Sequence, residues 1–172
     1  MRTWPGFSTG LDVTGNNIRW TPRDFQTFAL MKEGDDYLGA LSVAEGRVAK
    51  RVTDWTRLAG APPTPEEYEN FVKEIVPPYS KDKFDSKWVK LSRDKPSHTV
   101  VAHLSVDTYS HIHYDSAQAR GISVREAARL QSFPDGFKFL GDMSEAFSMI
   151  GNAVPPLLAF HLALSIKDQL TI

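Results

Sequence analysis

The sequence predicts an α+β fold with a helical N-terminal part, a small β-rich middle part and C-terminal helices. Two observations predict this division. Helix-start signals cluster before residue 76 and after residue 122, whereas residues 88–114 are rich in β-branched and aromatic side chains. A chain of 172 residues with 41% hydrophobic and 24% charged residues is long enough for about one ordinary globular domain.

Three helices are expected in the N-terminal part. The tetrapeptide Thr21-Pro22-Arg23-Asp24 predicts the start of a helix that ends near Gly34, since Thr can cap a helix and Pro suits its first position. A second helix is expected over residues 38–58, with Gly60 just beyond its end. Thr64 and Glu67 form a capping-box pattern that predicts a third helix, ending near residue 75.

The sequence predicts β-strands in the middle part, residues 88–114. Residues 88–91 and 98–104 have strand composition, and residues 109–114 alternate with period two. In such a strand His111 and His113 share one face.

The last third returns to helices. Ser123 and Glu126 form a second capping-box pattern, which opens a short helix. After a turn at residues 134–136 and a helical stretch at 144–150, a final helix is expected over residues 157–170. It is apolar on nearly all faces, so it needs packing on most of its surface. A chain of this size offers little to cover it, which points to a partner or a missing half.

Charge and composition exclude several classes of function. The net charge is −1, but residues 79–100 form a basic segment with six cations and three carboxylates. The chain has no cysteine, which excludes disulfides, zinc–thiolate sites, iron–sulfur clusters and a cysteine nucleophile on this polypeptide. No run of 18 apolar residues and no signal-peptide pattern is present, so we expect a cytoplasmic protein that does not enter the membrane.

Two segments carry a family resemblance. Residues 120–137, RGISVREAARLQSFPDGF, closely resemble the ninth sequence motif of DNA (cytosine-5)-methyltransferases. Residues 150–159, IGNAVPPLLA, resemble the tenth motif, in the same order and at a similar spacing. Upstream, residues 95–103, KPSHTVVAH, are similar to the target-recognition region, in which a threonine precedes an aliphatic residue, here Thr99-Val100. The resemblance extends over residues 81–172.

The resemblance implies a reaction that this chain does not complete. Enzymes of this family flip a cytosine out of duplex DNA, attack its ring with a cysteine and transfer a methyl group from S-adenosylmethionine to carbon 5. The chain lacks the cysteine and any Gly-x-Gly cofactor loop. Glu69-Asn70-Phe71 only partly matches the family's Glu-Asn-Val tripeptide and falls inside an expected helix. We therefore assign no catalytic residue and predict that the chain alone is inactive.

The resemblance also implies a domain organisation. Residues 1–118 correspond to the target-recognition region with a helical elaboration. Residues 119–172 correspond to the tail that returns to the catalytic domain. The C-terminal helices would then pack on a Rossmann-like methyltransferase domain absent from this chain.

Candidate site residues follow from these segments. The expected contacts to double-stranded DNA are Lys87, Lys90, Arg93, Lys95, Thr99 and His103. Lys50, Arg51 and Arg57 are further candidates for phosphate contacts. S-adenosylmethionine would meet Asn152, Ala153 and Val154, and only together with the missing catalytic half. Ser123, Arg125, Glu126 and Arg129 are expected to organise the ninth motif. The histidines lack carboxylates at ligand spacing, so no metal site is expected.

Several alternatives stay open at this stage. The chain could be the smaller subunit of a naturally split enzyme, a truncated product of a longer one, or an expressed fragment, with a restriction-modification or regulatory role. A different class is a non-enzymatic DNA-binding or regulatory module derived from the family. A third, a protein-interaction domain unrelated to DNA, requires both motif matches to be coincidental.

Overall fold

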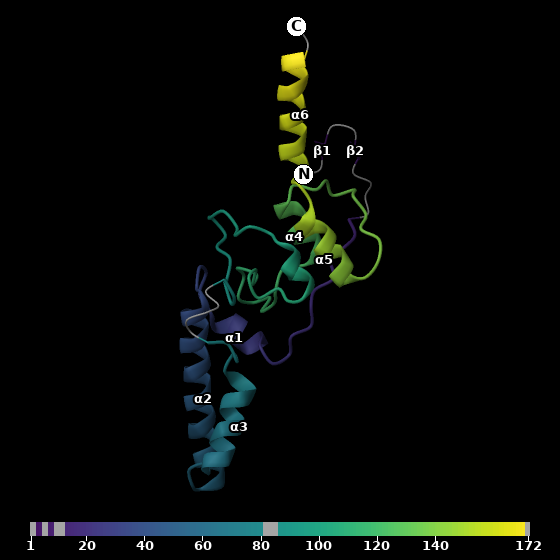
Figure 1. The fold of residues 1–172 in the computed structure, drawn as a ribbon. Coiled ribbons are helices and arrows are strands. Elements are labelled where there is room, and N and C mark those ends of the chain that lie inside the picture. Colours follow the sequence, from purple (N-terminus) through teal and green to yellow (C-terminus); the bar gives the residue numbers. More distant parts are fainter. Residues whose placement is uncertain (1–2, 5–6, 9–12, 81–85, 171–172) are drawn as a thin grey trace. The chain divides into compact units, whose positions relative to one another are not determined.

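The computed structural model describes residues 3–4, 7–8, 13–80 and 86–170 (Figure 1). The chain forms two compact units, each built from separate segments. The motif unit comprises Met1–Arg19, Ser97–Thr108 and Ile122–Ile172, and the hairpin unit comprises Trp20–Pro96 and Tyr109–Gly121. The functional division at residue 118 stays a prediction.

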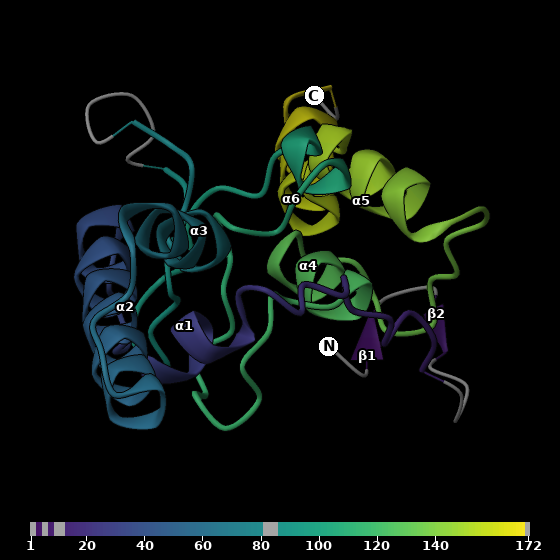
Figure 2. The same ribbon diagram turned by 90° about the horizontal axis from the view of Figure 1, so that it is seen from below.

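The hairpin unit is built on two long helices. Helix α2 spans Tyr37–Ala59, α3 spans Pro65–Ile75, and the two pack side by side, with the short α1 (Phe25–Leu30) against α2 (Figure 2). Gly60 ends α2 in the left-handed conformation (φ 75°), which glycine adopts without a steric penalty. The capping box of α3 at Thr64 and Glu67 is present as predicted.

Helix α1 begins later than the sequence predicts. Residues 22–24 form a turn rather than the first turn of a helix. The carboxylate of Asp24 accepts hydrogen bonds from the Tyr109 hydroxyl at 2.5 Å and from Arg23 Nε at 2.7 Å, and caps no backbone amide. Asp24 is therefore held in the interior by tertiary contacts, and the helix starts one residue beyond it.

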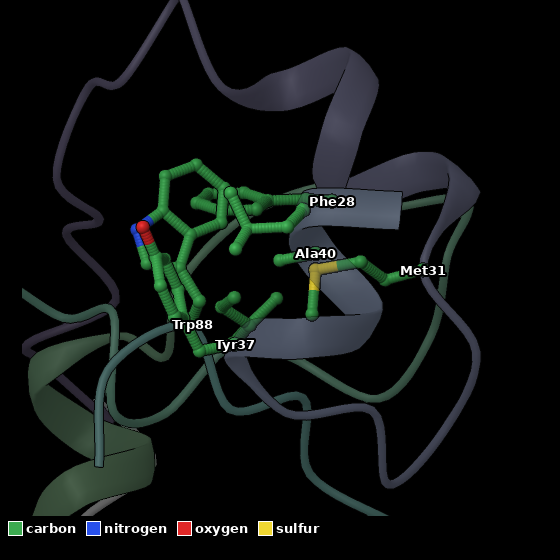
Figure 3. Close-up of a cluster of buried hydrophobic side chains, with 7 residues drawn as sticks. Phe28, Met31, Tyr37, Ala40 and Trp88 are labelled. Carbon is green, nitrogen blue, oxygen red and sulfur yellow. The ribbon is translucent and has the colours of Figure 1, made fainter. Parts of the chain in front are cut away.

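The core of the hairpin unit gathers Phe28, Met31, Tyr37, Ala40 and Trp88 (Figure 3). The Trp88 ring stacks on Tyr109 at 4.9 Å between ring centroids, and Phe28 meets Trp88 edge to face. These rings fix the stretch around Trp88 against α1 and α2.

The expected β-rich part is wrong. The described residues contain only the two-residue strands β1 (Thr3–Trp4) and β2 (Phe7–Ser8), paired antiparallel, and isolated bridges at Ile112. The backbone of Lys90 bonds to Gly34 and Asp35 in a loop rather than to a strand. Residues 102–105 form a 3₁₀ turn, η1 (Ala102–Ser105). The described fold is helical because β-prone side chains here line loops packed on helices.

The motif unit contains helices α4 (Val124–Leu130) and α5 (Met143–Asn152), with η1 packed on α5. Both helices open with capping boxes, at Ser123/Glu126 and at Asp142/Glu145. Gly151 allows α5 to approach η1 closely, since a Cβ there would lie 2.3 Å from backbone atoms of Val101 and Ala102. The tenth-motif glycine is thus required for packing.

Helix α6 (Pro156–Leu170) extends from α5 and has no buried residue (Figure 1). Residues Met143–Leu170 contain an 18-residue window with a mean hydropathy of 1.5, which is apolar enough for a membrane-crossing helix. The backbone is extended at Ala153 (ψ 143°), however, which separates α5 from α6. Fifteen residues of α6 span about 22 Å, less than the roughly 30 Å of a bilayer core. Composition alone is therefore weak support for a membrane span.

Candidate nucleic-acid interface and cofactor loop

The ninth motif is organised around a buried arginine. Arg125 is 1% exposed and donates hydrogen bonds to the carbonyls of Thr14 at 2.7 Å, Pro134 at 3.2 Å and Phe137 at 2.7 Å. Burial lowers the pKa of its guanidinium. A planar group with five donors can bind three backbone carbonyls at once, so Arg125 holds the loop at residues 134–137 against the segment that contains Thr14.

A second arginine of the ninth motif holds the same loop from the surface. Arg129 forms two hydrogen bonds to the buried Asp135 carboxylate, at 2.7 and 3.0 Å, and this contact lowers the pKa of Asp135. Gln131 Nε2 donates to the carbonyl of Ile150 at 3.1 Å, and Ser132 Oγ accepts from the amide of Leu157 at 3.1 Å. The ninth and tenth motifs are thus in direct contact, which their distance in sequence does not reveal.

The expected cofactor residues lie at the end of α5 and just beyond it, before α6 begins. The Asn152 side chain is exposed and donates to Ser148 Oγ at 3.4 Å, Ala153 is half-buried and Val154 is exposed. Three residues of one exposed turn can meet a ligand from one side, but they do not enclose S-adenosylmethionine. The residues present therefore do not make a complete cofactor site, and we derive no chemical step through it.

Lys90 differs from the other expected phosphate ligands. It is 1% exposed, and its Nζ donates to the carbonyls of Phe28 at 2.6 Å and Met31 at 2.9 Å and to Ser116 Oγ at 2.7 Å. Burial lowers the pKa of the ammonium. All three donors are used inside the unit, so Lys90 anchors α1 to the loop beyond it and does not present its charge to a phosphate. The expectation of a phosphate contact at Lys90 is corrected accordingly.

Three other cations of the basic segment reach the surface of the hairpin unit. Lys87 is half-buried with its Nζ 5.8 Å from the centroid of the Tyr79 ring. Arg93 is exposed and lies over the Tyr114 ring at 5.1 Å, and Lys95 is exposed. A cation–π contact positions a side chain without neutralising its charge, and the Arg93 side chain is exposed to solvent.

The remaining two expected DNA contacts belong to the motif unit. Thr99 is exposed, directly before the buried Val100. His103 is exposed on η1, with its Nε2 3.3 Å from Asp107 Oδ2. His103 belongs to η1, and Thr99 precedes it in the chain. Because η1 packs on α5, this segment lies next to the helix in which the tenth motif begins.

The two histidines expected to share one face of a strand, His111 and His113, are both buried. His111 Nδ1 lies 2.9 Å from Ser110 Oγ, and His113 Nδ1 accepts a hydrogen bond from the amide of Asp115 at 3.1 Å. His113 also stacks on Tyr114 at 4.4 Å. Both imidazoles are part of the packing of the hairpin unit.

Sequence reasoning missed one cation, Arg47 of α2. It lies with Lys50 and Arg51 on the wall of a cleft of about 700 Å³ between α1, α2 and α3. The spacing i, i+3, i+4 was the available signal, since it places three cations on one helix face.

With this geometry in place, the family can be stated. Residues 38–168 match the model of the C-5 cytosine-specific DNA methylase family, and the chain belongs to that family. Methyl transfer to cytosine is the activity of this family.

Individual relatives agree with this assignment. A protein of Oceanobacillus iheyensis that is named as a type II methyltransferase, M.OihORF3336P, is 55% identical over 159 residues, which cover 92% of this chain and 33% of that protein. The type II methyltransferase M.Bpa9945I of Bacillus paralicheniformis is 46% identical over 51% of this chain and 19% of its own. The DNA (cytosine-5-)-methyltransferase M.ApeKI of Aeropyrum pernix is 46% identical over 44% of this chain and 16% of its own.

The chain spans about a third of the length of the first of these relatives and less of the others. No solved structure matches it.

Proposed function

We propose that this chain is the DNA-recognition and C-terminal portion of an S-adenosylmethionine-dependent DNA (cytosine-5)-methyltransferase of the restriction-modification type. The catalytic cysteine and the glycine-rich cofactor loop then lie on another segment or subunit. The observation that carries this proposal is α6, an apolar helix without a buried residue in a chain that aligns with a third of a relative.

The apolar surface of α6 indicates what the missing part supplies. Leu158, Leu162 and Ile166 follow one another at four-residue intervals, so they share one face of the helix, and each is more than half exposed. Burying such leucine and isoleucine side chains contributes about 1.5–3 kcal/mol each, which makes a packed partner surface favourable. In this proposal α6 packs on the catalytic domain and brings Asn152, Ala153 and Val154 to its cofactor.

Double-stranded DNA would meet Lys87, Arg93, Lys95, Thr99 and His103. The cations supply salt-dependent affinity for phosphates, and Thr99 and His103 can hydrogen-bond to base edges. Lys90 is not among these contacts, because its ammonium donates its hydrogen bonds inside the hairpin unit.

Complementation tests the proposal directly. The purified chain, incubated with duplex DNA and methyl-labelled S-adenosylmethionine, should transfer no label. Adding the two thirds of the O. iheyensis relative that this chain does not match should give a complex and restore methylation. The double variant Leu162→Gln/Ile166→Gln should abolish the complex, while Lys73→Gln on α3 should leave it intact.

Other outcomes would contradict the proposal. Methylation by the pure chain would show that the reaction needs no second part. If the chain formed neither a complex nor an active enzyme with the complementary segment, the proposal that it is one part of a larger methyltransferase would be rejected. Tight, sequence-selective DNA binding by the chain alone would favour a non-enzymatic DNA-binding module.

A further inference from the structure

The cleft between α1, α2 and α3 is lined by none of the residues assigned above to DNA. Its lining combines the cations Arg47, Lys50 and Arg51 with apolar side chains that include Ala29, Leu30 and Ile75. Leu30 is 59% exposed. From this combination we infer that the cleft binds one strand of the DNA backbone, with phosphates on the cations and sugars on the apolar side chains. This inference rests on the proposed function only in taking DNA as the ligand.

The cations of the cleft are held in place but retain charge and donors. Arg47 donates to Thr27 Oγ1 at 2.5 Å and to Gln26 Oε1 at 2.9 Å, which leaves part of its five-donor guanidinium for a ligand. Arg51 lies over the Phe71 ring at 5.3 Å and makes no ion pair with the described residues. Neither contact neutralises the guanidinium, so both arginines are positioned to meet an anion.

Two carboxylates, Asp54 and Glu74, also line the cleft. Asp54 accepts from Lys50 at 2.6 Å and from Arg57 at 3.3 Å, and the Lys50 contact lowers its pKa. Three cations and two carboxylates thus line the cleft, and Arg57 lies beyond this lining. A phosphate entering the cleft therefore competes with Asp54 for Lys50.

The cations continue along α2 beyond the cleft, which favours a polynucleotide over a single phosphate group. Arg47 and Arg51, which line the cleft, are four residues or about 6 Å apart along the helix axis, and Arg57 lies about 9 Å further on, outside the lining. A DNA strand advances about 3.4 Å per nucleotide, so the cations from Arg47 to Arg57 can follow roughly four nucleotides.

Removing the competing carboxylate gives the sharpest test. Asp54→Asn should bind a 20-base-pair duplex about threefold more tightly than the natural chain and should steepen the salt dependence of binding. Glu69→Gln, which neutralises an exposed carboxylate on α3 outside the cleft, is the matched control and should change the affinity by less. A gain in affinity distinguishes this variant from one that loses binding because it misfolds, and circular dichroism checks that its helices are kept. An unchanged or weaker affinity for Asp54→Asn would overturn the inference.

Removing the cations is the complementary test. Lys50→Gln/Arg51→Gln should lower the affinity about tenfold at 0.1 M salt and reduce the slope of log K against log salt by roughly 1.8, as expected for two phosphate contacts. Lys73→Gln is the control with one exposed cation removed outside the cleft. Circular dichroism checks that the variants keep their helices.

A third variant, Lys87→Gln/Arg93→Gln/Lys95→Gln, separates this inference from the proposed function. Loss of affinity only in this variant rejects the cleft and keeps the proposed surface. Loss only in the cleft variant rejects the proposed surface and keeps the cleft. The absence of any DNA binding rejects both, and preferential binding of inorganic phosphate or of polyglutamate to the cleft rejects DNA as its ligand.

Discussion

Helices α5 and α6 follow each other in the chain and are both apolar, but they are buried to opposite extents. In α5, Ala146, Phe147 and Ile150 are buried against the rest of the motif unit. In α6 no residue is buried. An apolar helix stabilises the unit only where the chain supplies the facing surface. The difference marks α6 as the helix for which the described residues supply no facing surface, and four predictions can break or sharpen the comparison.

The largest effect is expected in α5. Phe147→Ala should lower the free energy of unfolding by about 3–5 kcal/mol, since it leaves a cavity at a fully buried ring. Leu162→Ala in α6 is the matched change and should alter the free energy of unfolding by less than about 0.5 kcal/mol. Urea denaturation followed by circular dichroism measures both. Equal losses in the two helices would mean that α6 is packed in solution.

A glycine change tests the contact that holds η1 on α5. Gly151→Ala should destabilise the chain by about 1–3 kcal/mol or more, because the added Cβ meets backbone atoms of Val101 and Ala102 that cannot turn aside. Gly46→Ala on α2 is the control, since no atom lies within 4 Å of its Cβ position. That change should stabilise the chain by up to about 1 kcal/mol through helix propensity. Thermal denaturation separates the two, and a harmless Gly151→Ala would reject the close approach.

The Asp135 carboxylate tests the loop beneath α4 through its pH dependence. Arg129 holds its pKa below the ordinary value, so the contribution of Asp135 to stability is present above about pH 4 and is lost as pH falls further. Asp135→Asn should cost about 2 kcal/mol at pH 7. The deficit relative to the natural chain should shrink below pH 4. Denaturation curves between pH 7 and pH 2 measure this convergence, with the exposed Asp94→Asn as control.

The smallest effect on folding is expected from polar substitutions on α6. Leu162→Gln/Ile166→Gln should leave the free energy of unfolding within about 0.5 kcal/mol of the natural value, because both side chains are exposed. The same variant should bind less of a dye that detects exposed apolar surface. A cooperative loss of stability would show that α6 packs within the chain itself.

Much of the helical part was predictable from local patterns. The capping boxes at Thr64/Glu67 and Ser123/Glu126 and the glycine stop at Gly60 are confirmed, because each depends on residues within one turn of the helix. The strands expected between residues 88 and 114 were wrong. Their β-branched and aromatic side chains lie in loops whose backbone bonds to distant segments, and period-two alternation does not distinguish the two cases.

For the candidate site, too, some residues could be predicted from the sequence and others could not. Family membership followed from the two motif segments, and exposed cations such as Arg93 and Lys95 were found from charge alone. Lys90 could not be separated from them by sequence, since its partners Phe28 and Met31 lie 62 and 59 positions away. Arg47 was missed because its place on the cleft depends on α1 and α3 as much as on its own helix.

The sequence by itself determined the family, the capped helices and the absence of cysteine from these 172 residues. These properties depend on residue identity and on spacings of three or four positions. Only the tertiary structure decided which lysine is buried, that Gly151 is needed for packing, and that α6 has no covering surface among the described residues. Those properties depend on which distant segments meet, because burial and hydrogen bonding are set by neighbours in space.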